Sequence, residues 1–314
     1  MMTSTSIIVA TTTLFGLASG CIAQLRVTPE MMAAAGLPLE GAPLADHGPY
    51  EVAASAAFGS PGLTVVYPTS LDVFPLRDTL PVLVWANGGC AVDSTYYGDF
   101  LSTIASHGFL VIATAKADAN HESATVDDLR AALDWIESEN NRADAPLNGK
   151  IATDQVAVMG QSCGGYLSIG LGADSRIDTV GVFNGGVRPD RPGNPAPPPF
   201  LTASALANLH GPVLIVNGHE SDFRMEDSRF TFDAIDKLPA FYGARHKAGH
   251  MGTILHPGGG EFANVASNWL MWWFKGDRQA GAMFAGRKCG LCRNSNWDVE
   301  TKAWPGKRRP RVLR

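Results

Sequence analysis

The sequence predicts an α/β fold in which a mostly parallel central sheet carries helices on both faces. Two continuous apolar runs, at residues 80–86 (LPVLVWA) and 109–114 (FLVIAT), are typical of strands that are buried on both sides. Segments with helical spacing alternate with such strands, which is the pattern of βαβ units. The chain of 314 residues is long enough for one large domain with a single core.

The individual elements follow from the apolar spacing and from the residues that end each run. Residues 125–139, for example, place their apolar side chains on one helical face behind an N-cap at Thr125 or Asp127. The predicted strands are residues 50–57, 63–67, 80–86, 109–114, 154–159, 179–184 and 213–217, of which the first two are antiparallel edge strands. The predicted helices are residues 96–107, 125–139, 200–209 and 263–274 and one that begins after Ser162.

The N-terminal segment has the pattern of an export signal. Residues 6–20 (SIIVATTTLFGLASG) form an apolar run that is shorter than the about 20 residues of a membrane span and ends in small residues. We therefore expect residues 1–23 to be removed before Gln24 and the mature protein to be secreted without membrane association, although no Lys or Arg precedes the run. The alternative is a lipid anchor at Cys21, because ASGC loosely resembles a lipobox.

The rest of the chain divides into a lead-in, a catalytic domain and a tail. Residues 24–49 are rich in Pro, Gly and Ala and are expected to be poorly ordered, residues 50–304 carry the elements above, and residues 305–314 form a basic tail. A proline-rich stretch within residues 187–207 is expected to be a loop near the site, with a neutral insertion as the alternative. The net charge is −5, the basic tail has no interleaved aromatic residues, and the cysteines and histidines show no zinc-like spacing. The sequence therefore does not predict binding of nucleic acid, of a metal or of a cofactor.

The stretch that carries the chemistry is residues 156–168 (VAVMGQSCGGYLS). It reads as a short apolar strand, a turn with Ser162 between two glycines and the start of a helix, which is the G-x-S-x-G nucleophile elbow. Larger side chains at the glycines would collide with the crossing strand and helix, and the helix N-terminus offers unpaired N–H groups to an anion. The alternative is a serine in an ordinary loop between a strand and a helix.

A serine hydroxyl needs a base within hydrogen-bonding reach, and the base needs an acid that orients it. On an elbow of this kind the acid and then the histidine follow the serine along the chain. Asp222, in the loop after the last predicted strand, is the preferred acid, with Glu220 as the alternative. His250, in a loop of small residues before the closing helix, is the preferred base, with His246 and His256 as alternatives.

The anion that forms when the serine attacks needs N–H donors. The strand at residues 80–86 opens into residues 87–90 (NGGC), where two glycines allow the backbone to turn its N–H groups inward. Gly89 is the preferred donor and Cys90 the second choice, together with Cys163, the residue after the nucleophile. One such donor is typically worth about 3–4 kcal/mol.

The side chains that contact the substrate are expected to come from scattered segments around the elbow. The candidates are Asn184, His219 and Tyr96, followed by Tyr97, Val187 and Phe223. Each is equally consistent with ordinary packing, so the sequence does not determine the acyl or the alcohol group.

Four motifs occur together: GQSCGG (160–165), NGGC (87–90), GHESD (218–222) and AGH (248–250). As a set they resemble the secreted α/β-hydrolase esterases, with the cutinase/polyester-hydrolase and dienelactone-hydrolase-like branch as the nearest group. The segment at residues 289–299 is also similar to C-terminal segments of some polyester-hydrolase-like proteins. The resemblance covers residues 50–304 and implies an α/β-hydrolase fold and ester hydrolysis. Polyester hydrolases usually carry an aromatic residue where Gly89 stands and methionine where Cys163 stands, so the resemblance does not extend to their substrate clamp.

Of the five cysteines, all but Cys21 remain if residues 1–23 are removed, and export permits disulfides. Cys90 and Cys163 lie on the two loops expected to meet at the oxyanion hole, so we expect them to be bonded. Two small buried thiols are the alternative. Cys289 and Cys292 would then close a short loop.

Together these features predict a secreted serine esterase, active as a monomer, that cleaves small-molecule or polymeric carboxylic esters through an acyl-enzyme. An exported peptidase or amidase would carry the same triad, and a catalytically inactive hydrolase fold could serve as a binding protein.

Overall fold

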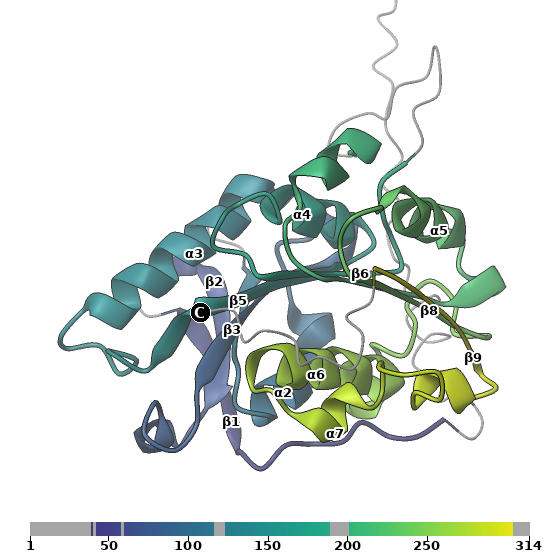
Figure 1. Ribbon diagram of the computed structural model, residues 1–314. Helices are drawn as coiled ribbons and strands as arrows, with labels where there is room; N and C mark the ends of the chain where they lie inside the picture. Colours follow the sequence, from purple (N-terminus) through teal and green to yellow (C-terminus); the bar gives the residue numbers. More distant parts are fainter. Residues whose placement is uncertain (1–38, 40–41, 58–59, 116–122, 189–200, 304–314) are drawn as a thin grey trace, which may run out of the picture.

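The computed structural model describes residue 39 and residues 42–57, 60–115, 123–188 and 201–303 (Figure 1). The expected signal peptide, the candidate lipid-anchor residue Cys21 and the basic tail at residues 305–314 lie outside this part of the chain, as do residues 189–200 of the proline-rich stretch.

The described part contains a nine-stranded sheet with the strand order β1-β2-β4-β3-β5-β6-β7-β8-β9. The strands from β3 to β8 run parallel, whereas β1, β2 and β9 are antiparallel to their neighbours. The strands are β1 (Val52–Ala57), β2 (Ser60–Pro68), β3 (Leu80–Ala86), β4 (Leu110–Thr114), β5 (Ile151–Gln161), β6 (Thr179–Phe183), β7 (Val213–Asn217), β8 (Ala240–Arg245) and β9 (Trp297–Lys302). The prediction of a mostly parallel sheet is confirmed.

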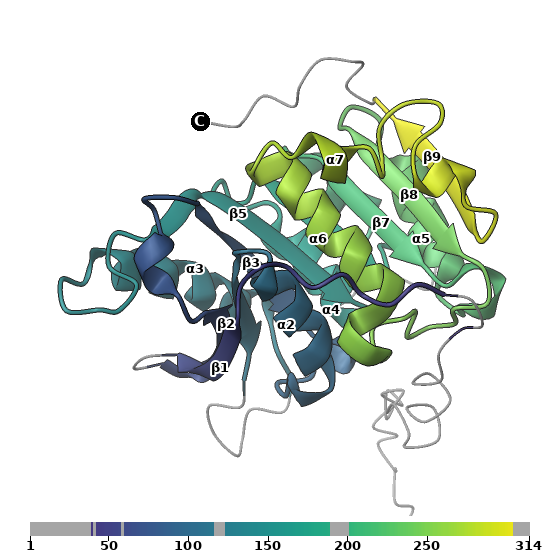
Figure 2. The same ribbon diagram turned by 90° about the horizontal axis from the view of Figure 1, so that it is seen from below.

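Helices cover both faces of this sheet, also as predicted (Figures 1 and 2). Successive side chains of a strand point to opposite faces, so Val82 and Val84 of β3 enter one core while Leu83 and Trp85 enter the other. The first core lies under α3 (Val126–Asn141), α4 (Cys163–Leu171) and α5 (Met225–Ala234). The second lies under α2 (Gly98–Ser106), α6 (Gly260–Phe274) and α7 (Arg278–Gly281).

The start of α3 shows how local sequence sets a helix boundary. Thr125, rather than Asp127, is the N-cap: its side chain accepts from the Asp128 N–H at 3.3 Å, and Asp128 Oδ2 accepts from the Thr125 N–H at 2.7 Å. A cap of this kind stabilises a helix by about 1 kcal/mol.

The sheet continues past the last predicted strand, which corrects the expectation that residues 213–217 end it. β8 is buried along its whole length although it ends in Arg245. The charge of Arg245 is neutralised by Glu261 of α6, with Arg245 Nε 2.6 Å from Glu261 Oε2, and both side chains are buried. Glu261 Oε1 also accepts from the Trp297 indole N–H at 3.1 Å. This buried ion pair therefore ties β8, α6 and β9 together, and no local apolar pattern reveals it.

Part of the expected lead-in is ordered against two helices. The Asp46 N–H donates to Asn264 Oδ1 of α6 at 2.6 Å, and the Gly48 N–H donates to Ser106 Oγ of α2 at 2.8 Å. Residues 42–49 therefore belong to the folded domain. The short helix expected at residues 200–209 is a 3-10 helix at Ala203–Asn208.

Candidate functional site

The elbow lies where β5 meets α4. β5 ends at Gln161, α4 begins at Cys163, and Ser162 between them has φ 54° and ψ −116°. A residue other than glycine in such a backbone conformation costs about 1–3 kcal/mol, so its surroundings must hold it there. One such contact is the hydrogen bond from the Ser162 N–H to the Phe183 carbonyl of β6, at 2.8 Å. Ser162 thus has the strand–turn–helix context that the G-x-S-x-G pattern predicts.

The two glycines of the motif are required by close backbone contacts. A Cβ on Gly160 would overlap the carbonyl oxygen of Gly164, and a Cβ on Gly164 would overlap the carbonyl oxygen of Ala86 at the end of β3. The missing side chains therefore allow α4 to start directly against β3, next to the loop at residues 87–90.

Ser162, His250 and Asp222 are hydrogen-bonded in series. His250 Nε2 lies 2.9 Å from Ser162 Oγ, and His250 Nδ1 lies 2.8 Å from Asp222 Oδ1. The side chain of His250 is 10% exposed and that of Asp222 is 0% exposed. The three residues that the sequence analysis selects are therefore brought together in a largely water-excluded position.

The alternatives that the sequence left open lie elsewhere. His246 Nε2 is 3.3 Å from Asp298 Oδ1. His256 is buried ahead of the 3-10 turn Pro257–Gly259, and Glu220 is exposed within the turn His219–Ser221.

Three further donors orient the Asp222 carboxylate. Oδ2 accepts from Asn184 Nδ2 at 2.8 Å and from the Gly218 N–H at 3.4 Å, while Oδ1 accepts from the Arg224 N–H at 2.9 Å. Because both oxygens are occupied by neutral donors, the carboxylate cannot rotate away from His250 without breaking them.

Asn184 corrects one expectation. It was a candidate substrate-binding residue, but its side chain is fully buried and Nδ2 also donates to the Gly249 carbonyl at 3.1 Å. Its φ of 51° lies in the left-handed region, which asparagine tolerates better than most residues. Asn184 therefore joins the loop of Asp222 to the loop of His250 and does not face the substrate.

Two of the expected substrate-binding side chains lie on the surface. Tyr96 is 65% exposed and Phe223 is 52% exposed. The Phe223 ring covers the imidazole of His250, with 3.9 Å between ring centroids and 35° between the planes. Tyr97 and Val187, in contrast, are buried and offer no surface to a substrate. Phe223 follows the acid directly, and that position was the signal that could have ranked it higher.

His219 also departs from its expected role as a substrate-binding residue. Its Nε2 lies 2.9 Å from Asp298 Oδ2, and its ring lies 4.4 Å from that of His246. Burial alone would raise the pKa of Asp298, but the hydrogen bonds from His246 and His219 outweigh it and lower that pKa. The ligand atoms of these three residues lie within 4.8 Å of one another, so they could hold a metal ion. The group is separate from the hydrogen bonds of the nucleophile.

The loop after β3 carries the candidate oxyanion donors. It forms a 3-10 turn at Gly88–Cys90, in which Gly89 has φ 66° and Cys90 has φ 51°. The Gly88 N–H already donates to the Tyr97 hydroxyl at 2.8 Å, so the next N–H groups, of Gly89 and Cys90, are the candidates. Cys163 is the first residue of α4, and an N–H at that position has no acceptor within its own helix.

Both cysteine pairs are bonded as the sequence analysis expects. Cys90 is joined to Cys163 with 5.1 Å between their Cα atoms, and Cys289 is joined to Cys292 with 4.9 Å. The first disulfide ties the loop at residues 87–90, called the oxyanion loop from here on, to the residue after Ser162. The second closes the turn that precedes β9.

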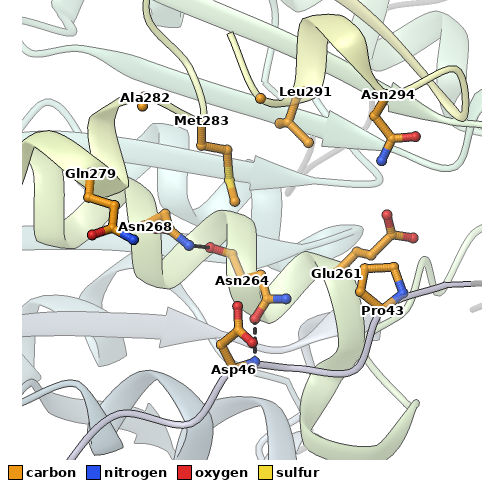
Figure 3. Close-up of a pocket in the computed structure, with 11 residues that line it drawn as sticks. Pro43, Asp46, Glu261, Asn264, Asn268, Gln279, Ala282, Met283, Leu291 and Asn294 are labelled. Atoms are coloured by element: carbon orange, nitrogen blue, oxygen red, sulfur yellow. Dashed lines mark hydrogen bonds between the residues drawn. The ribbon is translucent and has the colours of Figure 1, made fainter.

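A cavity of about 430 Å³ lies elsewhere, between α6, the segment after α7 and the N-terminal segment (Figure 3). Asn264, Asn268 and Glu261 line it from α6, and Met283 and Leu291 line it from the other side (Figure 3). Asn264 and Glu261 are used for the structural contacts described above. The cavity lining includes none of Ser162, His250 and Asp222. The candidate active site is therefore the hydrogen-bonded series at the elbow and not this cavity.

No helix in the described ranges combines the length and the apolar content that crossing a membrane requires. Residues 36–177 match a family model described as PETase: PET hydrolase-like, a range that includes the oxyanion loop and Ser162. None of the curated proteins matches the chain in sequence. The family match over residues 36–177 and the mostly parallel sheet covered by helices support a polyester-hydrolase-like α/β-hydrolase and, more generally, a serine ester hydrolase.

Proposed function

We propose that this protein is a secreted serine hydrolase that cleaves carboxylic esters through an acyl-enzyme. The observation that carries the proposal is the series from Ser162 Oγ to His250 Nε2 at 2.9 Å and from His250 Nδ1 to Asp222 Oδ1 at 2.8 Å. The family match supports an ester substrate.

In the acylation half, Ser162 Oγ attacks the ester carbonyl carbon while His250 Nε2 takes the hydroxyl proton. Asp222 accepts the Nδ1–H, which keeps Nε2 free to act as the base and stabilises the imidazolium. The N–H groups of Cys163 and of Gly89 or Cys90 donate to the oxyanion. The intermediate then collapses, and His250 delivers its proton to the leaving alcohol.

In the deacylation half, His250 takes a proton from a water molecule, whose oxygen attacks the acyl carbon. The second tetrahedral intermediate uses the same N–H donors. Its collapse releases the acid and returns the proton to Ser162 Oγ.

The surface that we expect the substrate to contact, beside Ser162 and His250, carries aromatic side chains that are exposed to solvent. We assign Phe223 and Tyr96 to it, because both rings are exposed and Phe223 lies directly on His250. Gly89 and Cys163 provide no aromatic or methionine side chain there, so an apolar acyl group or a small alcohol fits this surface better than a clamped polymer chain does.

The ester assignment is tested by turnover of p-nitrophenyl acyl esters of increasing chain length beside matched p-nitroanilides, together with labelling by a fluorophosphonate. We expect labelling of the native protein and faster cleavage of the esters than of the anilides. Anilide cleavage at the ester rate would instead indicate an amidase. A native protein that is not labelled would indicate an inactive hydrolase fold.

We also propose that the protein is exported and that residues 1–23 are removed. The two disulfides support this, because such bonds persist in oxidising compartments. Expression of the full chain should yield a secreted form that begins at Gln24, which mass spectrometry of its N-terminal peptide measures. A form that retains a lipid on Cys21 would support the anchored alternative, and an uncut intracellular form would contradict both.

A further inference from the structure

A chain of hydrogen bonds through two buried side chains, Tyr97 and Gln161, connects the oxyanion loop to the loop of His250. The Gly88 N–H donates to the Tyr97 hydroxyl at 2.8 Å, and that hydroxyl donates to Gln161 Oε1 at 3.1 Å. Gln161 Nε2 then donates to the His250 carbonyl at 2.9 Å. Gln161 directly precedes Ser162, so the chain joins the three segments whose relative positions determine the reaction.

These contacts admit one arrangement of donors and acceptors. With its amide reversed, Gln161 would set its oxygen against the His250 carbonyl, where no proton is available. Tyr97 and Gln161 are 5% and 1% exposed, so water does not replace the lost partners. Burial also raises the pKa of the Tyr97 hydroxyl, which therefore stays protonated and can donate.

The local packing is built around this chain. A Cβ on Gly88 would overlap Gln161 Oε1 and lie 2.6 Å from the Tyr97 hydroxyl oxygen, so only glycine lets the loop approach both. The Tyr97 ring is held by Trp85, with 5.5 Å between ring centroids. The disulfide joins Cys90 of this loop to Cys163 of α4. Of the contacts described here, only the hydrogen-bonded chain connects the oxyanion loop to the His250 backbone.

We propose that Tyr97 and Gln161 are positioning residues that hold the oxyanion donors and His250 at their working distance from Ser162. The inference rests on the proposed function, since it gives these residues a part in that reaction. A displacement of about 1 Å among reacting groups can cost about 100-fold in rate, and the loss of one oxyanion donor costs about 100- to 1000-fold.

The first test removes the central hydroxyl. Tyr97→Phe keeps the ring and is expected to lower kcat about 10- to 100-fold with KM changed less than about twofold, because the chain acts on the transition state. Tyr50→Phe is the matched control, since it loses a similar bond to Asp78, at 2.9 Å, away from the elbow. Equal kcat in the two variants would overturn the proposal.

The second test replaces Gln161 by a residue whose ability to donate a hydrogen bond depends on pH. In Gln161→Glu the buried carboxyl has a raised pKa, and its protonated form can donate to the His250 carbonyl as the amide does. Its kcat relative to the native enzyme should therefore increase as the pH falls, whereas Gln161→Met should stay impaired throughout. Identical activity of the two variants at every pH from about 5 to 9 would overturn the positioning role.

A third measurement does not depend on any activity. Amide hydrogen exchange at Gly88 and its neighbours should be faster in Tyr97→Phe than in Tyr50→Phe, because Gly88 loses its acceptor. Unchanged exchange would overturn the inference even if the enzyme is an esterase. If the native protein instead shows neither ester turnover nor fluorophosphonate labelling, the proposed function fails and the exchange result still decides whether the chain of hydrogen bonds holds the loop.

Discussion

Ser162→Ala is expected to lower kcat for ester hydrolysis by about 10⁵- to 10⁶-fold. The variant lacks the oxygen that attacks the carbonyl, so no acyl-enzyme can form. The remaining activity over uncatalysed hydrolysis, about 10³- to 10⁴-fold, would come from the oxyanion donors and from substrate binding. Initial rates on a p-nitrophenyl ester and the loss of fluorophosphonate labelling measure the effect.

The fold should survive this change, because the Ser162 N–H keeps its hydrogen bond to the Phe183 carbonyl. Circular dichroism and thermal melting are expected to match those of the native protein. Ser175→Ala, at an exposed serine after α4, is the matched control and should retain full activity. If purified Ser162→Ala kept more than about one hundredth of the native rate, the nucleophile would have to be another residue.

Asp222→Asn is expected to lower kcat by about 10⁴-fold with little change in KM. Both carboxylate oxygens accept hydrogen bonds, Oδ2 from Asn184 and Oδ1 from His250 and the Arg224 N–H. Whichever of the two oxygen positions the amide NH₂ of the variant takes, it therefore faces another hydrogen-bond donor. If it faces His250, it forces the proton onto Nε2, and the imidazole can no longer accept the proton of Ser162.

The size of this effect separates an orienting role from a merely structural one. The native-like stability of the variant can be checked by urea denaturation, and Asp236→Asn, at an exposed position after α5, serves as the control with unchanged kcat. A decrease of less than about tenfold in Asp222→Asn would show that another group orients His250.

The candidate nucleophile and its partners could be read from short motifs because their constraints are local. The strained turn at Ser162 requires Gly160 and Gly164, and those glycines stand in the sequence beside the residue they serve. Asp222 and His250 follow from the same logic, since each sits in a loop at the end of a buried segment. The other buried parallel strands were equally legible, because a strand covered on both faces is largely apolar; β8, which is buried but ends in Arg245, was not.

The roles of the residues that position the candidate site could not be predicted from local motifs, because their hydrogen-bond partners are remote in sequence. Tyr97 and Gln161 are 64 residues apart, and Asn184 and Asp222 are 38 apart. An asparagine or tyrosine beside an active site has no pattern that separates an inward from an outward orientation. For this reason the sequence leaves Asn184 and Tyr97 as candidates for either the substrate surface or ordinary packing, and only the fold shows that both are buried.

The sequence by itself determined the alternation of strands and helices, the elbow with Ser162, and the order in which the acid and the base follow it. Those features depend on side-chain periodicity and backbone sterics over a few residues. Only the tertiary structure decided which polar groups meet: His250 with Asp222, Tyr97 with Gln161, and Arg245 with Glu261 at the unpredicted strand β8. A buried polar group must find its partner wherever the packed chain supplies one, so these pairings are set by the whole fold.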